Sequence, residues 1–314
     1  MGGHVFSTHT APIKIENIDP TLNRYFAELK HLFPKKINIF NSDIFIPLGS
    51  VGKKSISGDI DLGIDITCVL DANISDKSIA EWNIDPTNVT AEFNILKKRA
   101  RTSSDKQLRI KAFLKILAQY INKNSSHLQV DEKKVTDGNM FGLFPQIDQT
   151  GNYIGIGVQI DWMIGNVDWL KFSYYSSAYP NDSNIKGLHR TQLLLSTFQL
   201  ADLSFSHVNG VKDKTSGELI AENPSTAINV LNDRLKLDIT LSDVENYYHL
   251  HSLLKSKLSP NKYNELLNVY FKILDSTRAD IPDNIQDEWI TKQSTLNLTG
   301  KFLPNNSKLK RVLS

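Results

Sequence analysis

Acidic and apolar residues alternate in one short stretch near residue 60. Between Asp59 and Ile66 every second residue is Ile or Leu, and the positions between them are occupied by Asp59, Asp61, Gly63 and Asp65. Successive side chains of a β-strand point to opposite faces, so this stretch predicts a strand with one apolar and one acidic face. The apolar face would be buried. Two carboxylates on the other face repel each other unless they share a cation.

Further apolar runs of strand length lie on both sides of this stretch. Asn38 and the apolar residues 44–46 predict a strand that ends at Pro47. Residues 128–135, 140–147 and 153–163 predict three more strands, and the last two are separated by a turn that suits a hairpin. Placing residues 153–163 beside the acidic strand would bring Asp161, which has apolar neighbours, close to Asp59 and Asp61.

Helical spacing of apolar residues dominates the second half of the chain. In the first half it predicts helices over residues 20–32, with Asp19 as N-cap and Pro20 at the first helical position, and over residues 105–122. Residues 71–104 are mixed and polar. Past residue 170 it predicts helices over residues 185–198, 224–235, 241–258 and 260–274, with a short hairpin within residues 205–221. The fold class is therefore α/β (α+β), with a mixed-sheet domain over residues 1–170 and a mainly helical domain over residues 171–314.

Composition is that of a globular protein. The chain has 314 residues, of which 40% are hydrophobic and 22% charged, so it can bury a sizeable core and form two domains. Its formal net charge is only +2, so binding of a nucleic acid would depend on a local basic patch. Residues 97–101 with Lys106, Arg109 and Lys111 are the best candidate for contacting acceptor phosphates, and a solvated surface is the alternative.

Cysteine content and hydropathy limit the cellular context. Cys68 is the single cysteine, which excludes a disulfide within the chain and a cysteine-based zinc cluster. Residues 1–12 lack an apolar stretch of signal-peptide length, and no run approaches the ~20 apolar residues of a membrane span. We expect a cytoplasmic protein without membrane contact, ending in a basic tail over residues 304–314. The sequence does not indicate an oligomeric state.

A glycine-serine turn directly precedes the acidic strand. Gly49 would let the backbone approach a polyphosphate, and Ser50 could offer a hydroxyl and an amide N–H to an anion. Lys53 and Lys54 add positive charge. Together with Asp59 and Asp61, this turn suits a nucleoside triphosphate held on Mg²⁺, a hard cation that carboxylates and phosphates bind together.

These residues resemble a known family. Gly49-Ser50, a spacer of eight residues and Asp59-Ile60-Asp61-Leu62 are similar to the Gly-Ser…Asp-x-Asp motif of the polymerase-β-like nucleotidyltransferase superfamily. The resemblance covers roughly residues 35–170 and implies a third carboxylate on a later strand, for which Asp161 is the candidate. It implies an α/β nucleotidyltransferase core in which Asp59, Asp61 and Asp161 are the catalytic and metal-binding residues.

The resemblance also implies an activity. A nucleoside monophosphate would pass from an NTP, such as ATP, to a hydroxyl acceptor with release of pyrophosphate, on two Mg²⁺ ions ~3.5–4 Å apart, with Mn²⁺ as a substitute. RNA or another nucleotide is the favoured acceptor. Cyclic or linear oligonucleotide synthesis, transfer to a small molecule or protein, and a non-catalytic nucleotide-binding module are the alternatives.

The second half offers candidate nucleotide-binding residues. Lys186 and Arg190 lie one helical turn apart and could clamp a triphosphate, although a solvated helix face or an interdomain salt bridge explains them equally well. Three tyrosines precede them and could stack on a base, although core packing is the commoner role; they are Tyr174, Tyr175 and Tyr179. His249 and His251 form only half of a metal site, so a zinc site is not expected there.

Overall fold

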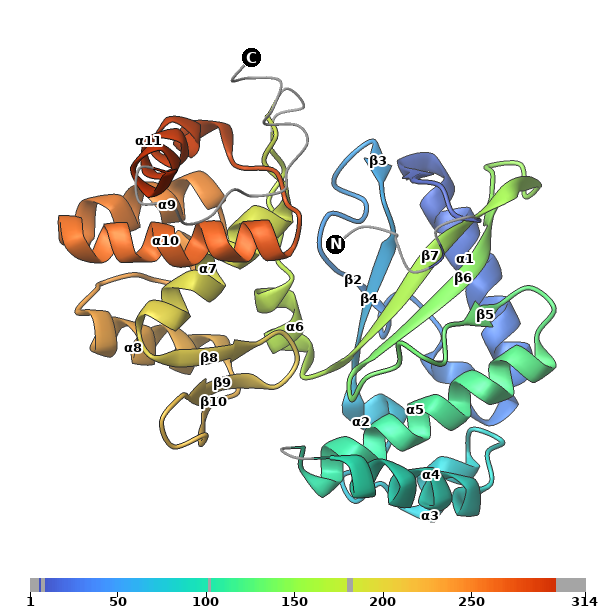
Figure 1. Ribbon diagram of the computed structural model, residues 1–314. Helices are drawn as coiled ribbons and strands as arrows, with labels where there is room; N and C mark the ends of the chain where they lie inside the picture. Colours follow the sequence, from blue (N-terminus) through green and yellow to red (C-terminus); the bar gives the residue numbers. More distant parts are fainter. Residues whose placement is uncertain (1–5, 7–8, 101–102, 180–182, 298–314) are drawn as a thin grey trace.

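The computed structural model describes residues 6, 9–100, 103–179 and 183–297. Buried apolar side chains form two large clusters along the chain. We call the cluster between Ile13 and Ile164 the first core, and the cluster between Trp169 and Trp289 the second core. The first contains the main sheet, and the second is largely helical (Figure 1). This architecture confirms the predicted α/β class, whereas the domain boundary between residues 170 and 171 stays a prediction.

Five strands form the mixed sheet of the first core. Their order is β2-β4-β7-β6-β5, with β4 and β7 parallel and the other neighbours antiparallel. The bounds are Ile46–Pro47 for β2, Ile60–Asp65 for β4, Gln129–Val130 for β5, Asn139–Ile147 for β6 and Tyr153–Gly165 for β7. The predicted acidic strand and the predicted hairpin of β6 and β7 are confirmed. The strand expected over residues 128–135 shrinks to the two residues of β5.

The two faces of β4 differ as the alternation predicts. Ile60, Leu62 and Ile64 are fully buried in the first core, together with residues of α1 (Ile15–Leu32) and α5 (Asp105–Asn124). Asp61 points to the other face, which it shares with Asp161 of β7. We call this the acidic face. Burial of one face by helices therefore leaves the carboxylates on the face that is not packed into the first core.

Helix α1 begins earlier than expected. It starts at Ile15, with Lys14 at the N-cap position and Pro20 inside the helix, so the prediction of Asp19 as N-cap was wrong. Asn17 and Ile18 are buried and continue the apolar face of the helix towards its N-terminus. Burial of this extra turn outweighs the loss of the hydrogen bond that Pro20 cannot donate.

The strand predicted around residues 38–46 is mostly absent. Asn38 lies in a 3₁₀ helix, η1 (Pro34–Ile39), and only β2 pairs with the sheet. Pro47 is part of β2, which a proline tolerates because β2 is an edge strand and its outer side needs no N–H donor. A second short pair, β1 (Ile13–Lys14) with β3 (Ile56–Ser57), holds the end of the segment that precedes β4.

The polar residues 71–104 form helices that the apolar pattern did not predict. They include α3 (Asp76–Ala80) and α4 (Pro86–Arg99), which follow α2 (Ile66–Val69). Side chains of Ser75 and Asp85 cap α3 and α4. Val89 is the only fully buried side chain of α4, so this helix lacks the apolar stripe on which the prediction depended.

Helices and one small sheet surround the second core. The helices predicted over residues 185–198, 224–235 and 260–274 are confirmed, and α6 and α11 were not expected. The bounds are Val167–Ser173 for α6, Gly187–Leu200 for α7, Pro224–Leu235 for α8, Tyr247–Lys257 for α9, Pro260–Ser276 for α10 and Gln286–Asn297 for α11. The predicted hairpin is a three-stranded antiparallel sheet of β8 (Leu203–Ser206), β9 (Gly210–Asp213) and β10 (Leu219–Ala221).

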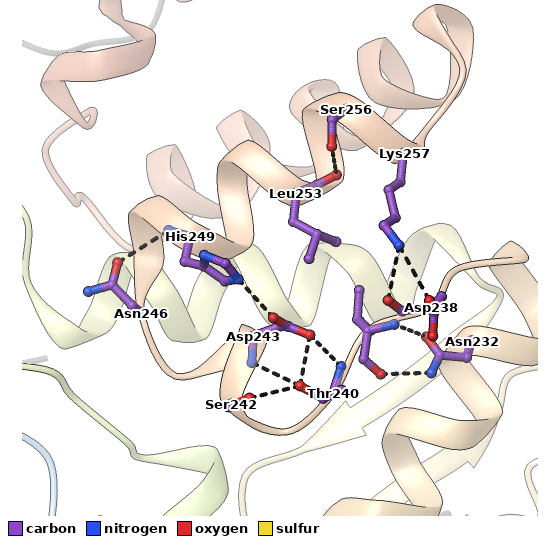
Figure 2. Close-up of polar contacts among 11 residues, drawn as sticks. Asn232, Asp238, Thr240, Ser242, Asp243, Asn246, His249, Leu253, Ser256 and Lys257 are labelled. Carbon is purple, nitrogen blue, oxygen red and sulfur yellow. Dashed lines mark hydrogen bonds and ion pairs between the residues drawn. The ribbon is translucent and has the colours of Figure 1, made fainter.

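The single helix expected over residues 241–258 is broken in two. A 3₁₀ turn, η2 (Ser242–Val244), is followed by α9, and Asn246 separates them by accepting hydrogen bonds from the N–H groups of Tyr248 and His249. Figure 2 shows how Asp243 fixes this turn by accepting hydrogen bonds from Thr240 and contacting His249 at 2.8 Å. Side-chain capping therefore overrides continuous apolar spacing here.

The remaining two predictions concern the C-terminal tail and membrane-spanning helices. The basic tail over residues 304–314 lies outside the described residues. No helix within the described part of the chain combines the length and apolar character that crossing a bilayer requires.

Candidate metal centre

Three carboxylates meet on the acidic face. Asp61 and Asp161 occupy paired positions of the parallel strands β4 and β7, and Asp59 lies just before β4. One carboxylate oxygen from each residue lies within 4.8 Å of the others. The adjacency of the third aspartate to the Asp-x-Asp pair, expected from sequence, is therefore present. Asp65 instead caps α2 by accepting a hydrogen bond from the N–H of Thr67.

The buried third carboxylate is only half satisfied. Asp161 is 3% exposed, and its Oδ2 accepts a hydrogen bond of 2.7 Å from Nε2 of Gln159. Its Oδ1 is buried and has no hydrogen-bond partner among the described residues. An unpaired buried acceptor is costly, so an oxygen in this position indicates that something else binds it.

Burial and mutual repulsion disfavour ionisation of this group. Burial, the charge of Asp61 and that of Asp59 together raise the pKa of Asp161 to about 9. Burial and the charge of Asp59 raise the pKa of Asp61 to about 7. Both carboxyls therefore hold protons at pH values where ordinary aspartates are ionised, unless a cation replaces those protons.

The donor set fits a hard divalent cation. Three carboxylates supply only oxygen ligands, which Mg²⁺ and Mn²⁺ prefer, and the cluster contains no histidine or cysteine. The buried Oδ1 of Asp161, which has no hydrogen-bond partner among the described residues, is an acceptor that such a cation could satisfy. These three residues could therefore hold a divalent metal, while the presence of two ions stays a prediction.

Gly49 of the glycine-serine turn lies directly against this cluster. Its φ is +61°, and a Cβ added to it would lie 3.4 Å from Oδ2 of Asp61. The N–H of Leu48 donates to the carbonyl of Asp61 at 2.9 Å, which fixes the turn to β4. Glycine is suited to this position because side chains disfavour positive φ. Ser50 follows and is half-buried.

The lysines after the turn lie between the two cores. Nζ of Lys53 donates to the carbonyl of Ser176 at 2.8 Å and lies 4.9 Å from the ring centroid of Tyr175. Lys54 has a lowered pKa, first because it is partly buried and second because the positive charge of Lys186 is near. Lys186 is exposed and contacts Asp280 at 3.7 Å. The positive charges of Lys54 and Lys186, which are far apart in the sequence, therefore act on each other.

Arg190 lies elsewhere than the spacing suggested. It is fully buried, and its Nε and Nη1 donate to the carbonyls of Val244 and Phe172 at 2.6 and 2.7 Å. It does not share an exposed face with Lys186, because nearly every side chain of α7 is buried or half-buried. A direct contact of Arg190 with a triphosphate stays a prediction, and the contacts above are those of a residue that ties α6 to η2.

The three tyrosines have separate environments. Tyr179 is buried, and its hydroxyl accepts a hydrogen bond from the N–H of Tyr247. Tyr175 is half-buried beneath Lys53. Burial raises the pKa of Tyr174, and the negative charges of Asp61 and Asp161 add to this effect. Tyr174 and Tyr175 are therefore nearer to the candidate metal centre than Tyr179, and base stacking stays a prediction for all three.

Other candidate residues are partly engaged by neighbouring charges. In the basic cluster, Lys97 contacts Asp105 at 2.6 Å and Arg109 contacts Asp76 at 3.2 Å, while Arg101 lies outside the described residues. Contact of this cluster with nucleic acid stays a prediction. His249 contacts Asp243, as noted above, and Nε2 of His251 hydrogen-bonds the hydroxyl of Tyr263.

Sequence reasoning assigned no role to Gln159 or Ser176. Gln159 is two residues before Asp161 on the same strand, so the alternation that places Asp161 also places Gln159 on the acidic face. That spacing was the available signal. Ser176 binds Lys53 through its backbone carbonyl group, which every residue type has, so the sequence could not indicate this contact.

No protein-family model matches the sequence, and no curated protein matches it. What can be said of function therefore depends on the geometry of the site.

Proposed function

We propose that the protein is a metal-dependent nucleotidyltransferase that transfers a nucleoside monophosphate from an NTP to a hydroxyl acceptor. The observation that carries this proposal is the meeting of Asp59, Asp61 and Asp161 on the acidic face, with one buried carboxylate oxygen of Asp161 unpaired. A glycine turn lies against one side of this cluster, Lys53 and Lys54 follow that turn, and the positive charge of Lys186 acts on Lys54. A metal site alone needs neither of these additions, whereas a site for a metal-bound triphosphate needs both.

The reaction forms a phosphoester bond to the acceptor and breaks the phosphoanhydride bond between the α- and β-phosphates. The acceptor hydroxyl loses its proton to water, its oxygen forms a bond to the α-phosphorus, and the bond from that phosphorus to the β-bridging oxygen breaks. Pyrophosphate leaves with the bonding electrons. Divalent ions held by the three aspartates would neutralise negative charge on the attacking and leaving oxygens.

The chain's own residues have three tasks in this reaction. Asp59, Asp61 and Asp161 hold cations in one place, and the sheet fixes the relative positions of Asp61 and Asp161. Gly49 leaves room beside Asp61 for phosphate oxygens, because any side chain would occupy that space. Lys54 and Lys186 supply positive charge to the triphosphate, as compact charges of the kind that bind phosphates.

Product analysis tests this proposal. The protein is incubated with each α-labelled NTP and Mg²⁺ or Mn²⁺, with and without total RNA, and the products are resolved chromatographically. Asp161→Asn removes one carboxylate at nearly constant size, and Asp65→Asn is the matched control, because asparagine also caps helices well. We expect label in a product with the wild type and Asp65→Asn, and none with Asp161→Asn.

The products also identify the acceptor. Label in RNA identifies terminal transfer, and a small product that forms without RNA identifies oligonucleotide synthesis. Tight NTP binding with no product from the wild type in either metal would contradict the proposal and favour a nucleotide-binding module.

A further inference from the structure

Gln159 and Asp161 form a buried pair on the acidic face. They are 2% and 3% exposed, and the amide Nε2 of Gln159 donates to Oδ2 of Asp161 at 2.7 Å. Because the two residues are two positions apart on β7, their side chains leave the sheet on the same side. The strand itself therefore sets this contact.

The hydrogen bond from Gln159 makes the two carboxylate oxygens of Asp161 different from each other. Oδ2 is engaged by Gln159, and Oδ1 is the oxygen without a hydrogen-bond partner among the described residues. A carboxylate held in this way offers a cation one oxygen with both lone pairs free and one oxygen with a lone pair already engaged, so binding through Oδ1 alone is favoured. Asp161 is thus prepared to bind a metal through a single oxygen.

Cations differ in their demand for a second oxygen. Mg²⁺ requires a nearly octahedral shell at 2.0–2.1 Å and takes one oxygen from each carboxylate, whereas Ca²⁺ accepts six to eight oxygens and often binds both oxygens of a carboxylate. A third ligand limited to one oxygen therefore favours Mg²⁺, and also Mn²⁺, over Ca²⁺.

We propose that Gln159 is a positioning residue that makes Asp161 a one-oxygen ligand and thereby sets the preference of the site for Mg²⁺ over Ca²⁺. This inference rests on the proposed metal-dependent function. It goes beyond that function because it assigns metal selectivity to a residue that does not itself bind the metal.

A second buried glutamine shows what a purely structural role looks like. Gln146 on β6 is also 2% exposed, and its Nε2 donates to the backbone carbonyls of Ala11 and Gly157. Its partners are backbone groups that join the N-terminal segment to the sheet. Gln159 instead binds the side chain of a candidate metal ligand, so the two glutamines form a matched pair for experiment.

A metal-binding assay tests this inference and does not depend on catalytic activity. Full-length wild type, Gln159→Met and Gln146→Met are titrated with MnCl₂ by electron paramagnetic resonance, and Mg²⁺ and Ca²⁺ are then each titrated against bound Mn²⁺. Methionine has the length of glutamine but no N–H donor. Mutation of a residue that hydrogen-bonds a metal ligand typically lowers the metal affinity by about 10- to 100-fold. We expect the ratio of the Ca²⁺ to the Mg²⁺ dissociation constant to fall about tenfold in Gln159→Met and to stay at the wild-type value in Gln146→Met.

Further variants distinguish a failure of this inference from misfolding and from a failure of the proposed function. Gln159→Leu also removes the donor without adding a charge, and the same fall in the ratio is expected if Gln159→Met does not fold. An unchanged ratio in a folded Gln159 variant, with Mn²⁺ binding lost in Asp161→Asn, would overturn the inference and leave the metal centre intact. Absence of Mn²⁺ binding by the wild type would overturn the proposed function itself, and the inference with it.

Discussion

Asp61 on β4 and Asp161 on β7 lie directly opposite each other in a parallel pair of strands. Neighbouring strands are about 4.8 Å apart, so two side chains at paired positions on one face are forced into proximity. Like charges at that separation destabilise a sheet. A fold that keeps this arrangement, with one of the two carboxylates buried, is stable with a cation between them or with protons on them.

The stability of the metal-free protein should therefore fall as the pH rises from about 6 to about 9. Asp61 and Asp161 have pKa values raised to about 7 and about 9, whereas the unfolded chain loses these protons near the ordinary value of 3.8. The folded state thus binds more protons in this range, and its free energy of unfolding decreases with pH until the folded groups have ionised. Urea denaturation in chelator at several pH values measures this slope.

Asp161→Asn is the control for this slope. Its free energy of unfolding should depend less on pH and should exceed that of the wild type by about 1 kcal/mol or more near pH 9. Equal slopes for both proteins would contradict the assignment of these protons. Mg²⁺ should flatten the wild-type curve, because it replaces the protons.

Gly49→Ala should impair nucleotide and metal binding more than it impairs stability. Gly49 has φ +61°, and the new Cβ would lie 3.4 Å from Oδ2 of Asp61, in the space that a phosphate oxygen needs. Gly52→Ala is the matched control, since Gly52 has φ +72° and nothing within 4 Å of its added Cβ. Both variants should lose about 1–2 kcal/mol of stability from backbone strain. Only Gly49→Ala should raise the KM for the NTP and lower kcat, and similar kinetics for both would contradict the close approach of a phosphate at Gly49.

Lys54→Ala and Lys186→Ala should each weaken NTP binding about tenfold while leaving the free energy of unfolding nearly unchanged. Each removes a positive charge that the structure holds near the other, and charge-assisted contacts to phosphate contribute roughly 1.5–3 kcal/mol. The loss should be larger for an NTP than for the corresponding monophosphate, which fluorescence titration of labelled nucleotides can measure. Lys272→Ala, an exposed position on α10, is the control. Equal losses for triphosphate and monophosphate would place these lysines away from the β- and γ-phosphates.

Arg190→Met should destabilise the protein by about 2–4 kcal/mol. It would leave the carbonyl of Val244 without its Arg190 donor and the carbonyl of Phe172 with only the N–H of Tyr175 at 3.5 Å, and an unpaired buried group costs about 1–3 kcal/mol. Arg234→Ala removes the exposed contact with Asp213 and should cost less than about 1 kcal/mol. Guanidinium denaturation compares the two. A stable Arg190→Met protein with a raised KM for the NTP would instead support the direct triphosphate contact predicted from sequence.

Periodicity predicted the parts of the site that lie on regular strands. The alternation around Asp61 is strict because one face of β4 is fully buried, and a one-residue shift in register would bury the carboxylates. The apolar run around Asp161 predicted its strand for the same reason. Periodicity indicates which face of a strand is buried but not which strand lies beside it. The pairing of β4 with β7 was harder still to predict because the long connection between them includes α4, which has a single fully buried side chain and almost no apolar signal.

Helical spacing was a poorer guide to exposure. The predicted helical turn between Lys186 and Arg190 does not form, because Lys186 is the N-cap of α7 with an extended backbone; it is exposed, whereas Arg190 is fully buried inside a helix packed on most of its circumference. A spacing of four residues indicates a shared face but does not say whether that face meets solvent. Contacts to backbone carbonyls, such as those of Arg190 and Lys53, depend on tertiary structure and have no sequence pattern of their own.

The turn beside the metal centre is also attached to the other core. Gly49 forms an isolated bridge with Tyr175, and Lys53 binds the carbonyl of Ser176, so both ends of this short turn are tied to the segment that follows α6. Any hinge movement that separates the two cores would therefore pull on the turn that lies against Asp61. The geometry of the candidate metal centre therefore depends on the second core as well as on the sheet that carries its three carboxylates.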